Sequence, residues 1–346
     1  MTKLLLTENN LIMNLKLIEK SDLKRLTDQR AREVKIGESI QAGSDFILED
    51  LADSTATFVI LGIPENVGPR ANCGQGGSES AWEAFLPKFL NIQETDKFKG
   101  EDLLLLGSLD CSEFNALPSD DLASLRKAVA EIDYVVSDLI KLIVSAGKIP
   151  IIIGGGHNNA YGAIKGSSQA FNQAINCINL DPHADYRTTE GRHSGNGFTY
   201  AKNEGYLADY AVLALHENYN SAAMLQQMQE DGVHHIFFED IFLRNKIDYR
   251  LSINQMLDLV NDQKYGVELD CDAIQDFPSS AQTPSGISTN DARLYLTIAG
   301  SSKNAVYLHL PEAAPALVKG SAPQVGKLLA YLVSDFVKAK KSFSGS

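Results

Sequence analysis

The sequence has few of the features that mark secreted, membrane-spanning or disulfide-bonded proteins. Its 346 residues include four cysteines, and no two of them form a Cys-x-x-Cys pair. This spacing argues against a disulfide framework or a zinc knuckle and favours a reducing cytoplasm. No apolar run approaches the roughly 18 residues of a membrane span, and the first residues are too briefly apolar for a signal sequence. We therefore expect a cytoplasmic protein with no membrane partner.

Positive charge is also scarce. The chain has 31 Lys and Arg residues against 44 Asp and Glu residues, which gives a formal net charge of −13. A surface of this sign repels polyanions, so nucleic acid is not an expected partner. Clustered carboxylates are costly until a cation neutralises them, so the same balance permits bound metal ions. The chain also lacks a phosphate-binding loop, a dinucleotide-binding glycine motif, a serine-hydrolase elbow and the zinc motif His-Glu-x-x-His.

From about residue 57 onward, short apolar runs alternate with longer helical patterns. The runs are typical of strands buried on both faces, and the alternation predicts an α/β fold with a mainly parallel sheet between two layers of helices. The expected strands are 57–63, 102–106, 149–153, 175–180, 210–215, 235–238, 266–270 and 305–310. The expected helices are 79–90, 122–145, 221–230, 251–260, 289–298 and 324–336. Residues 1–55 are more charged and less regular, so we predict an N-terminal extension there, wrapping the outside of a single domain at 56–346.

Histidines and aspartates follow three of the expected strands at the point where each one ends. They are His157 after Gly-Gly-Gly, then Asp181, His183 and Asp185, and finally Asp270 and Asp272. Ligand sites of open parallel sheets lie beyond the carboxyl ends of the strands, and alternate residues of extended backbone point the same way. Each motif alone has a structural interpretation as a turn, a surface pair or a helix cap. All three together predict that two imidazoles and four carboxylates converge on one rim.

Such a cluster predicts a pair of metal ions. Four carboxylates carry −4, and two divalent cations offset that charge. Oxygen ligands with some imidazole and no thiolate suit Mn²⁺, while Zn²⁺, Co²⁺ and Fe²⁺ are also compatible. Two ions that share a water molecule lower its pKa, so hydrolysis is the predicted reaction class.

In this order, the three motifs resemble those of the binuclear manganese ureohydrolases, the family of arginase, agmatinase, guanidinobutyrase and formimidoylglutamase. The resemblance covers roughly residues 57–340 and implies a single three-layer α/β domain with an eight-stranded, mainly parallel sheet. It implies that His157, Asp181, Asp185 and Asp270 hold one Mn²⁺, and that Asp181, His183, Asp270 and Asp272 hold the other. Members of the family often form trimers or hexamers, which leaves a homo-oligomer open.

A fourth motif, Glu312-Ala-Ala-Pro315, resembles the family's Glu-x-x-Pro, whose glutamate receives the cationic group of the substrate. Other segments look most like those of formimidoylglutamase. They are the Gly-Gly-Gly turn before His157, the residues that follow Asp185, the segment that begins at His193 and residues 68–74. The resemblance implies that Asp185 and Glu312 are catalytic. It implies substrate contacts from Arg70, Asn72, Arg187, Ser194, Asn196 and Glu312.

The implied activity is hydrolysis of N-formimidoyl-L-glutamate to L-glutamate and formamide, a step of histidine degradation. Arg70 and Arg187 suit a substrate with two carboxylates, because a guanidinium group pairs with a carboxylate through two hydrogen bonds. Two alternatives stay open. One is an agmatinase, arginase or guanidino-acid hydrolase of the same family, and the other is a non-catalytic homologue that acts as a binding module. The remaining histidines are expected to be structural, and His193 is the first candidate for an exception.

Overall fold

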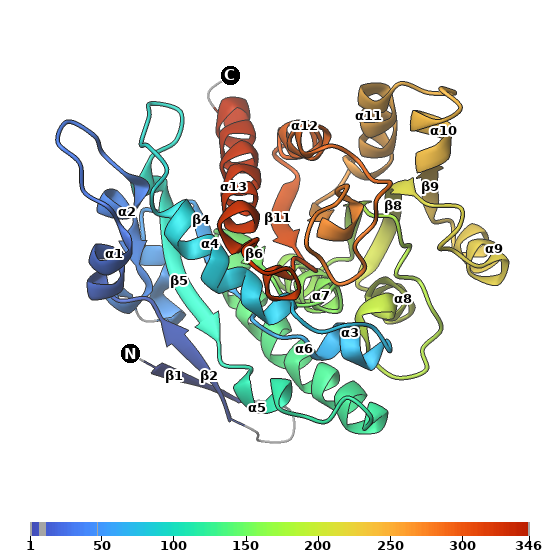
Figure 1. Cartoon of the computed structure of the whole chain (residues 1–346), viewed down its shortest axis with the longest axis horizontal. Coiled ribbons are helices and arrows are strands. Elements are labelled where there is room, and N and C mark those ends of the chain that lie inside the picture. The colour runs from blue at the N-terminus through green and yellow to red at the C-terminus, as the bar shows by residue number, and fades with distance from the viewer. Residues whose placement is uncertain (1, 7–11, 47, 345–346) are drawn as a thin grey trace.

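The chain folds around one continuous twisted sheet (Figure 1). The structure is a computed structural model that describes residues 2–6, 12–46 and 48–344. The strands are β1 (Thr2–Leu6), β2 (Ile12–Leu17), β3 (Gln41–Ala42), β4 (Phe58–Gly62), β5 (Leu103–Leu109), β6 (Ile149–Ile153), β7 (Ile175–Leu180), β8 (Leu207–Leu215), β9 (His234–Phe237), β10 (Tyr265–Leu269) and β11 (Ala305–Leu310). Within these residues ten of the 11 strands lie in the order β1-β2-β5-β4-β6-β11-β10-β7-β8-β9, and the eleventh, β3, pairs with β5.

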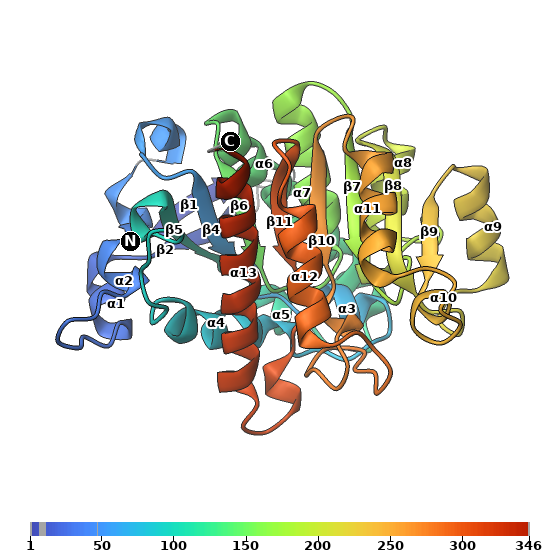
Figure 2. The same ribbon diagram turned by 90° about the horizontal axis from the view of Figure 1, so that it is seen from above.

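Helices cover both faces of the sheet. They are α1 (Lys20–Leu26), α2 (Ile36–Ser39), α3 (Val67–Ala71), α4 (Ala81–Phe89), α5 (Ser112–Asn115), α6 (Leu122–Ser145), α7 (Asn159–Phe171), α8 (Gly197–Asn203), α9 (Ala222–Glu230), α10 (Phe238–Phe242), α11 (Tyr249–Val260), α12 (Thr289–Ala299) and α13 (Ala322–Ser344). One hydrophobic core lies under α4, α11, α12 and α13, and the other lies under α6, α7 and α8 (Figure 2). In the described part of the chain, no helix combines the length and the apolar character needed to span a bilayer.

The strands from β4 to β11 pair in parallel throughout, which confirms the predicted eight-stranded parallel sheet. Each of the eight expected runs falls on one of these strands, with ends shifted by up to three residues. The parallel pairing follows from the alternation of strands and helices, because a chain that returns through a helix re-enters the sheet in the same direction. All carboxyl ends of these strands therefore meet at one edge of the sheet.

The N-terminal region extends the sheet at β5. Strand β2 pairs antiparallel with β5, β1 pairs antiparallel with β2, and the short β3 runs parallel to β5. These strands cover backbone groups that an edge strand would otherwise expose. Residues 2–6, 12–46 and 48–55 thus add to the sheet and do not only wrap its outside, which corrects that part of the prediction. The division into an extension at 1–55 and a domain at 56–346 stays a prediction.

Helix α7 was not among the expected helices. Its glycines lower helix propensity in the isolated sequence, but the packing in the fold requires them. A Cβ atom at Gly162 would lie 2.7 Å from Val136 Cγ1, and one at Gly166 would lie 2.4 Å from the Ser137 carbonyl oxygen. The two glycines therefore let α7 approach α6 closely, and this contact holds the segment that begins just after His157.

Candidate metal centre

Four side chains meet in a buried cluster beyond β6, β7 and β10. His157 Nδ1 lies 3.0 Å from Asp181 Oδ2, 3.0 Å from Asp185 Oδ2 and 2.9 Å from Asp270 Oδ2. One ligand atom from each of the four lies within 4.8 Å of the others, a spacing that one metal ion can bridge. These are the four residues that the sequence predicts around one ion, and we call them the His157 cluster.

His183 and Asp272 flank this cluster on its more open side. His183 Nδ1 lies 3.6 Å from Asp181 Oδ1 and 3.9 Å from Asp272 Oδ2. The two oxygens of Asp181 therefore face different histidines, as expected of a carboxylate shared between two ions. The structure thus brings all six predicted ligands together, although the distances around His183 are longer than those around His157.

Short turns hold the aspartates in place. Asp181 Oδ1 accepts a hydrogen bond from the backbone N–H of His183, and Asp270 Oδ1 accepts one from that of Asp272, both at 2.7 Å. Asp185 and Glu312 have φ angles of 48° and 64°. Left-handed backbone is costly for residues other than glycine and is often found at functional sites, where the surrounding structure holds it.

The Gly-Gly-Gly turn before His157 needs its glycines. Gly154 and Gly155 have φ angles of 80° and 74°, and a Cβ atom at Gly155 would lie 2.8 Å from the Ile63 carbonyl oxygen. The buried Glu65 anchors the turn by accepting a hydrogen bond from the backbone N–H of Gly156 at 2.6 Å. The turn therefore delivers His157 from β6 at a fixed angle.

Burial controls the ionisation of the aspartates. It raises the pKa of Asp270 well above its usual range, and the charges of Asp272 and Asp181 raise that pKa further. Burial also raises the pKa values of Asp185 and Asp272. For Asp181 burial acts in the same direction, but hydrogen bonds from His157 and His183 outweigh it and lower the pKa. The site concentrates more negative charge than a buried environment tolerates, and bound cations would relieve that repulsion.

A cavity of about 180 Å³ opens beside the cluster. Its polar lining includes Asn72, His183, Asp185, Arg187, Ser194, Asp270, Asp272 and Glu312. Glu312 Oε1 accepts a hydrogen bond from the His157 backbone N–H at 2.7 Å, while its Oε2 is buried without a hydrogen-bond partner among the described residues. Burial, followed by the charge of Asp272, raises the pKa of Glu312 to about 8. This carboxyl group has one free oxygen for a cationic ligand.

Three of the predicted substrate contacts lie together at the cavity. Arg187 Nη1 donates to Asn72 Oδ1 at 3.0 Å, and Asn72 Nδ2 lies 3.5 Å from Ser194 Oγ. The Arg187 side chain is 53% exposed, so its guanidinium group remains accessible to a ligand. The arrangement places one positive group beside a site that is otherwise strongly negative.

Two other residues predicted to contact the substrate, Arg70 and Asn196, do not line the cavity. The guanidinium group of Arg70 is almost fully buried and donates to the backbone carbonyls of Asn115 and Leu117, away from the cavity lining. The Asn196 side chain is fully buried; its oxygen accepts from Arg192 Nη1 at 2.6 Å, and its nitrogen donates to backbone carbonyls of its own loop. Both side chains therefore hold loops in place, which corrects the prediction for these two residues.

Arg192 supports the loop that carries Asp185, which yields a stability prediction. Its buried guanidinium group donates to Asp133 Oδ2 at 2.7 Å and packs over the rings of Tyr161 and Tyr200, with 4.8 Å to each centroid. We expect Arg192→Met to lower the free energy of unfolding by about 3–5 kcal/mol, because Asp133 is left buried without its partner. Urea unfolding measures the loss. Adding Asp133→Leu should restore much of it, and a loss below about 1 kcal/mol would contradict this role.

Sequence reasoning missed the buried carboxylates that support the ligands. Glu65 follows β4, and Glu268 lies within β10, two residues before Asp270 and on the same face of the strand. His309, expected to be structural, contacts Glu268 from β11. The available signal was a glutamate inside an apolar strand, because a buried charge of this kind needs a partner. His193 is buried and accepts a hydrogen bond from the Gly195 backbone N–H, which fits its expected structural role.

The chain also matches a known protein family. The model described as "Arginase family" matches residues 56–335, most of the chain. The chain belongs to the arginase family. This result confirms the predicted resemblance and the arginase-like fold.

Curated relatives in this family carry the name formimidoylglutamase. The chain is 28% identical to that of Macrococcus caseolyticus over 183 residues, which covers 53% of this chain and 54% of the relative. It is 27% identical to that of Psychrobacter cryohalolentis over 233 residues, covering 61% and 66%. It is 25% identical to that of Streptococcus pyogenes over 287 residues, covering 77% and 82%. The chain thus spans about half to two thirds of the first curated relatives it matches.

Solved structures share the fold. Formiminoglutamase of Trypanosoma cruzi with Mn2+2 superimposes with a TM-score of 0.70 at 20% identity, covering 89% of this chain and 98% of that one. Formimidoylglutamase of Bacillus subtilis gives a TM-score of 0.72 at 17% identity, covering 91% and 94%. A hypothetical agmatinase of Burkholderia thailandensis gives 0.66 at 14% identity, covering 85% and 88%. At these identities the likeness concerns the fold alone.

Proposed function

We propose that this member of the arginase family is a binuclear-metal hydrolase that cleaves N-formimidoyl-L-glutamate to L-glutamate and formamide. The observation that carries the proposal is the buried His157 cluster next to Glu312, a carboxyl group that lines the same cavity as Asp185 and Asp270 of that cluster. The curated relatives named formimidoylglutamase support the choice of substrate.

The donor set fits two divalent ions. His157 Nδ1 has no hydrogen-bond donor or acceptor assigned to it, yet three carboxylate oxygens lie 2.9–3.0 Å away. One ion would be held by His157, Asp181, Asp185 and Asp270, and the other by Asp181, His183, Asp270 and Asp272. Oxygen-rich ligands favour Mn²⁺, and the related T. cruzi enzyme was solved with Mn2+2. When bound, such ions supply a water molecule of lowered pKa and stabilise developing negative charge.

The side chains around the cavity have separate roles in this proposal. Glu312 Oε2 receives the cationic N–C–N group of the substrate and fixes its plane, because a carboxylate pairs best with a planar cation through charge-assisted hydrogen bonds. The water oxygen adds to the formimidoyl carbon, and the bond from that carbon to the glutamate nitrogen then breaks. Asp185 accepts a proton from the water and passes it to the departing amine.

Arg187 is the proposed contact for a substrate carboxylate. We expect Arg187→Ala to raise KM for N-formimidoyl-L-glutamate about tenfold with kcat nearly unchanged. The increase in KM is modest because this arginine is half exposed. Steady-state kinetics measures the effect. A formimidoyl amine without carboxylates provides the comparison, since its KM should not change. Arg244→Ala, at an exposed arginine paired with Glu217 away from the cavity lining, is the matched control. Equal effects of both substitutions would contradict the assignment.

A substrate panel tests the proposed function. Protein loaded with Mn²⁺ is incubated with formimidoylglutamate, guanidinobutyrate, agmatine and arginine, and formamide and urea are quantified. The proposal predicts formamide from the first substrate and little urea from the others. Urea as the main product would reassign the chain within the family, and no product with any substrate would favour the non-catalytic alternative.

We also propose a cytoplasmic location. All four cysteines, Cys73, Cys111, Cys177 and Cys271, are free thiols, which fits a reducing compartment. A homo-oligomer stays a prediction of the family resemblance.

A further inference from the structure

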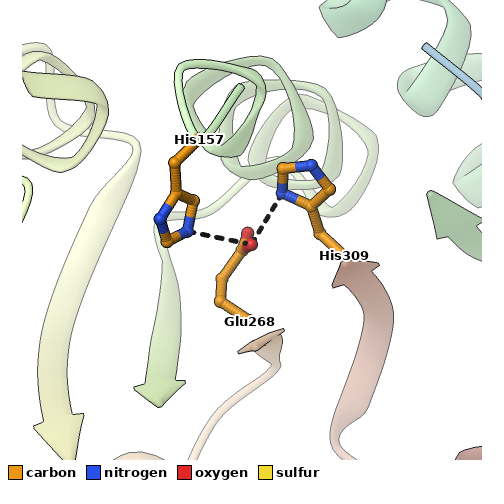
Figure 3. A group of neighbouring side chains, drawn as sticks. All are labelled: His157, Glu268 and His309. Atoms are coloured by element: carbon orange, nitrogen blue, oxygen red, sulfur yellow. Dashed lines mark hydrogen bonds and ion pairs between the residues drawn. The ribbon is translucent and has the colours of Figure 1, made fainter. Parts of the chain in front are cut away.

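A buried glutamate connects His157 to a second histidine behind the cluster (Figure 3). Glu268 comes from β10 and His309 from β11, while His157 lies on the turn after β6. Glu268 Oε2 lies 3.4 Å from His157 Nε2 and 2.7 Å from His309 Nδ1. None of the three side chains is exposed. The His157 ring thus faces carboxylates on both sides, with Nδ1 toward the cluster and Nε2 toward Glu268.

Other contacts hold the Glu268 carboxylate in one orientation. The Tyr307 hydroxyl donates to its Oε1 at 2.8 Å, so both oxygens have fixed partners. Glu268 Oε2 lies 2.7 Å from His309 Nδ1, so contacts on both oxygens restrain this carboxylate in the core.

This geometry decides which nitrogen of His157 is available to a metal. A neutral imidazole offers a lone pair on one nitrogen and keeps its proton on the other, and the hydrogen bond made by the protonated nitrogen selects the tautomer. We propose that Glu268 is a positioning residue: it accepts the Nε2 proton of His157 and directs the Nδ1 lone pair toward the metal held by Asp181, Asp185 and Asp270. This inference rests on the proposed metal centre.

A separate metal site is the alternative, since ligand atoms of His157, Glu268 and His309 lie within 4.8 Å of one another. Two observations favour the positioning role. The contacts of Glu268 to Tyr307 and His309, at 2.8 and 2.7 Å, have the length of direct hydrogen bonds. In addition, none of these three metal-ligand candidates lines the cavity beside the cluster, where an ion would enter.

Mn²⁺ binding, measured without any substrate, tests the inference. The electron paramagnetic resonance signal of free Mn²⁺ is followed while the metal-free protein is titrated. Wild-type protein should bind two ions, and Glu268→Gln should weaken the binding of one of them about 10- to 100-fold, as is typical when an outer partner of a ligand is lost. Asp258→Asn, at an exposed position of α11, is the control, because it removes a carboxylate that contacts neither Glu268 nor His157. Its Mn²⁺ affinities should stay within about threefold of wild type.

Two further measurements keep the outcomes distinct. If Glu268→Gln does not fold, Glu268→Asp replaces it, and the retained charge should give an affinity between those of wild type and a full loss. Unchanged affinities in the Glu268 variants, or equal losses in Asp258→Asn, would overturn the positioning role. Three ions in wild type and two in Glu268→Gln would establish the separate site instead, and no bound Mn²⁺ in wild type would overturn the inference.

Protein that binds two ions but releases no formamide would refute the proposed function alone, because the titration does not depend on turnover.

Discussion

Replacing Asp270 by Asn should change the stability of the protein in opposite directions with and without metal. In a chelator, the variant should unfold at a higher temperature than wild type, because it removes one charge from a carboxylate whose pKa is raised by burial and by Asp272 and Asp181. With Mn²⁺ present, the order should reverse. A ligand at 1,000 times its Kd stabilises a protein by about 4 kcal/mol, and the variant loses most of this gain.

Thermal unfolding in EDTA and in excess Mn²⁺ measures both effects, and formamide release should fall at least 100-fold in the same variant, beyond the loss typical of an outer partner. Asp258→Asn, at an exposed position of α11, is the control and should leave both transitions nearly unchanged. A shift of the same sign in both conditions would show that Asp270 has only a structural role.

Replacing Glu312 by Gln should separate substrate binding from metal binding. The amide keeps the shape of the side chain but loses the charge that would pair with the amidinium group. Breaking a buried charge pair costs about 2–5 kcal/mol, so kcat/KM should fall about 30- to 5,000-fold. Glu312 is not one of the proposed ligands, so Mn²⁺ stoichiometry should remain at two.

Steady-state kinetics, together with the Mn²⁺ titration on the same sample, checks this result. Glu312→Asp is the companion variant, since it keeps the charge but withdraws it by one methylene group, and its activity should lie between the other two. Activity within tenfold of wild type in Glu312→Gln would remove Glu312 from the substrate site.

Sequence patterns predicted the parallel sheet and the convergence of the six ligand candidates for one physical reason. Asp181 and Asp270 come directly after apolar strands, His157 follows a three-glycine turn after another, and the carboxyl ends of parallel strands meet at one edge. The order of the strands supplies the rest of the explanation. Strands β6, β11, β10 and β7 are neighbours in the sheet, although the chain visits them far apart in sequence.

The supporting residues could not be predicted in the same way. Glu268 and His309 lie inside strands, where the sequence does not show which strand will be the neighbour, so their contact with His157 depends on the sheet order. The predicted contact of Arg70 with the substrate is not supported by the structure, for a related reason. A guanidinium group is a suitable carboxylate ligand only when its donors are free, and four of the five N–H groups of Arg70 donate within the protein.

Anomalous diffraction at the manganese edge, from crystals grown with Mn²⁺, tests the central claim most directly. The account predicts two peaks about 3.5–4 Å apart, the usual spacing of paired catalytic ions, with Asp181 and Asp270 between them. A single peak, or two peaks away from His157 and His183, would contradict the binuclear centre.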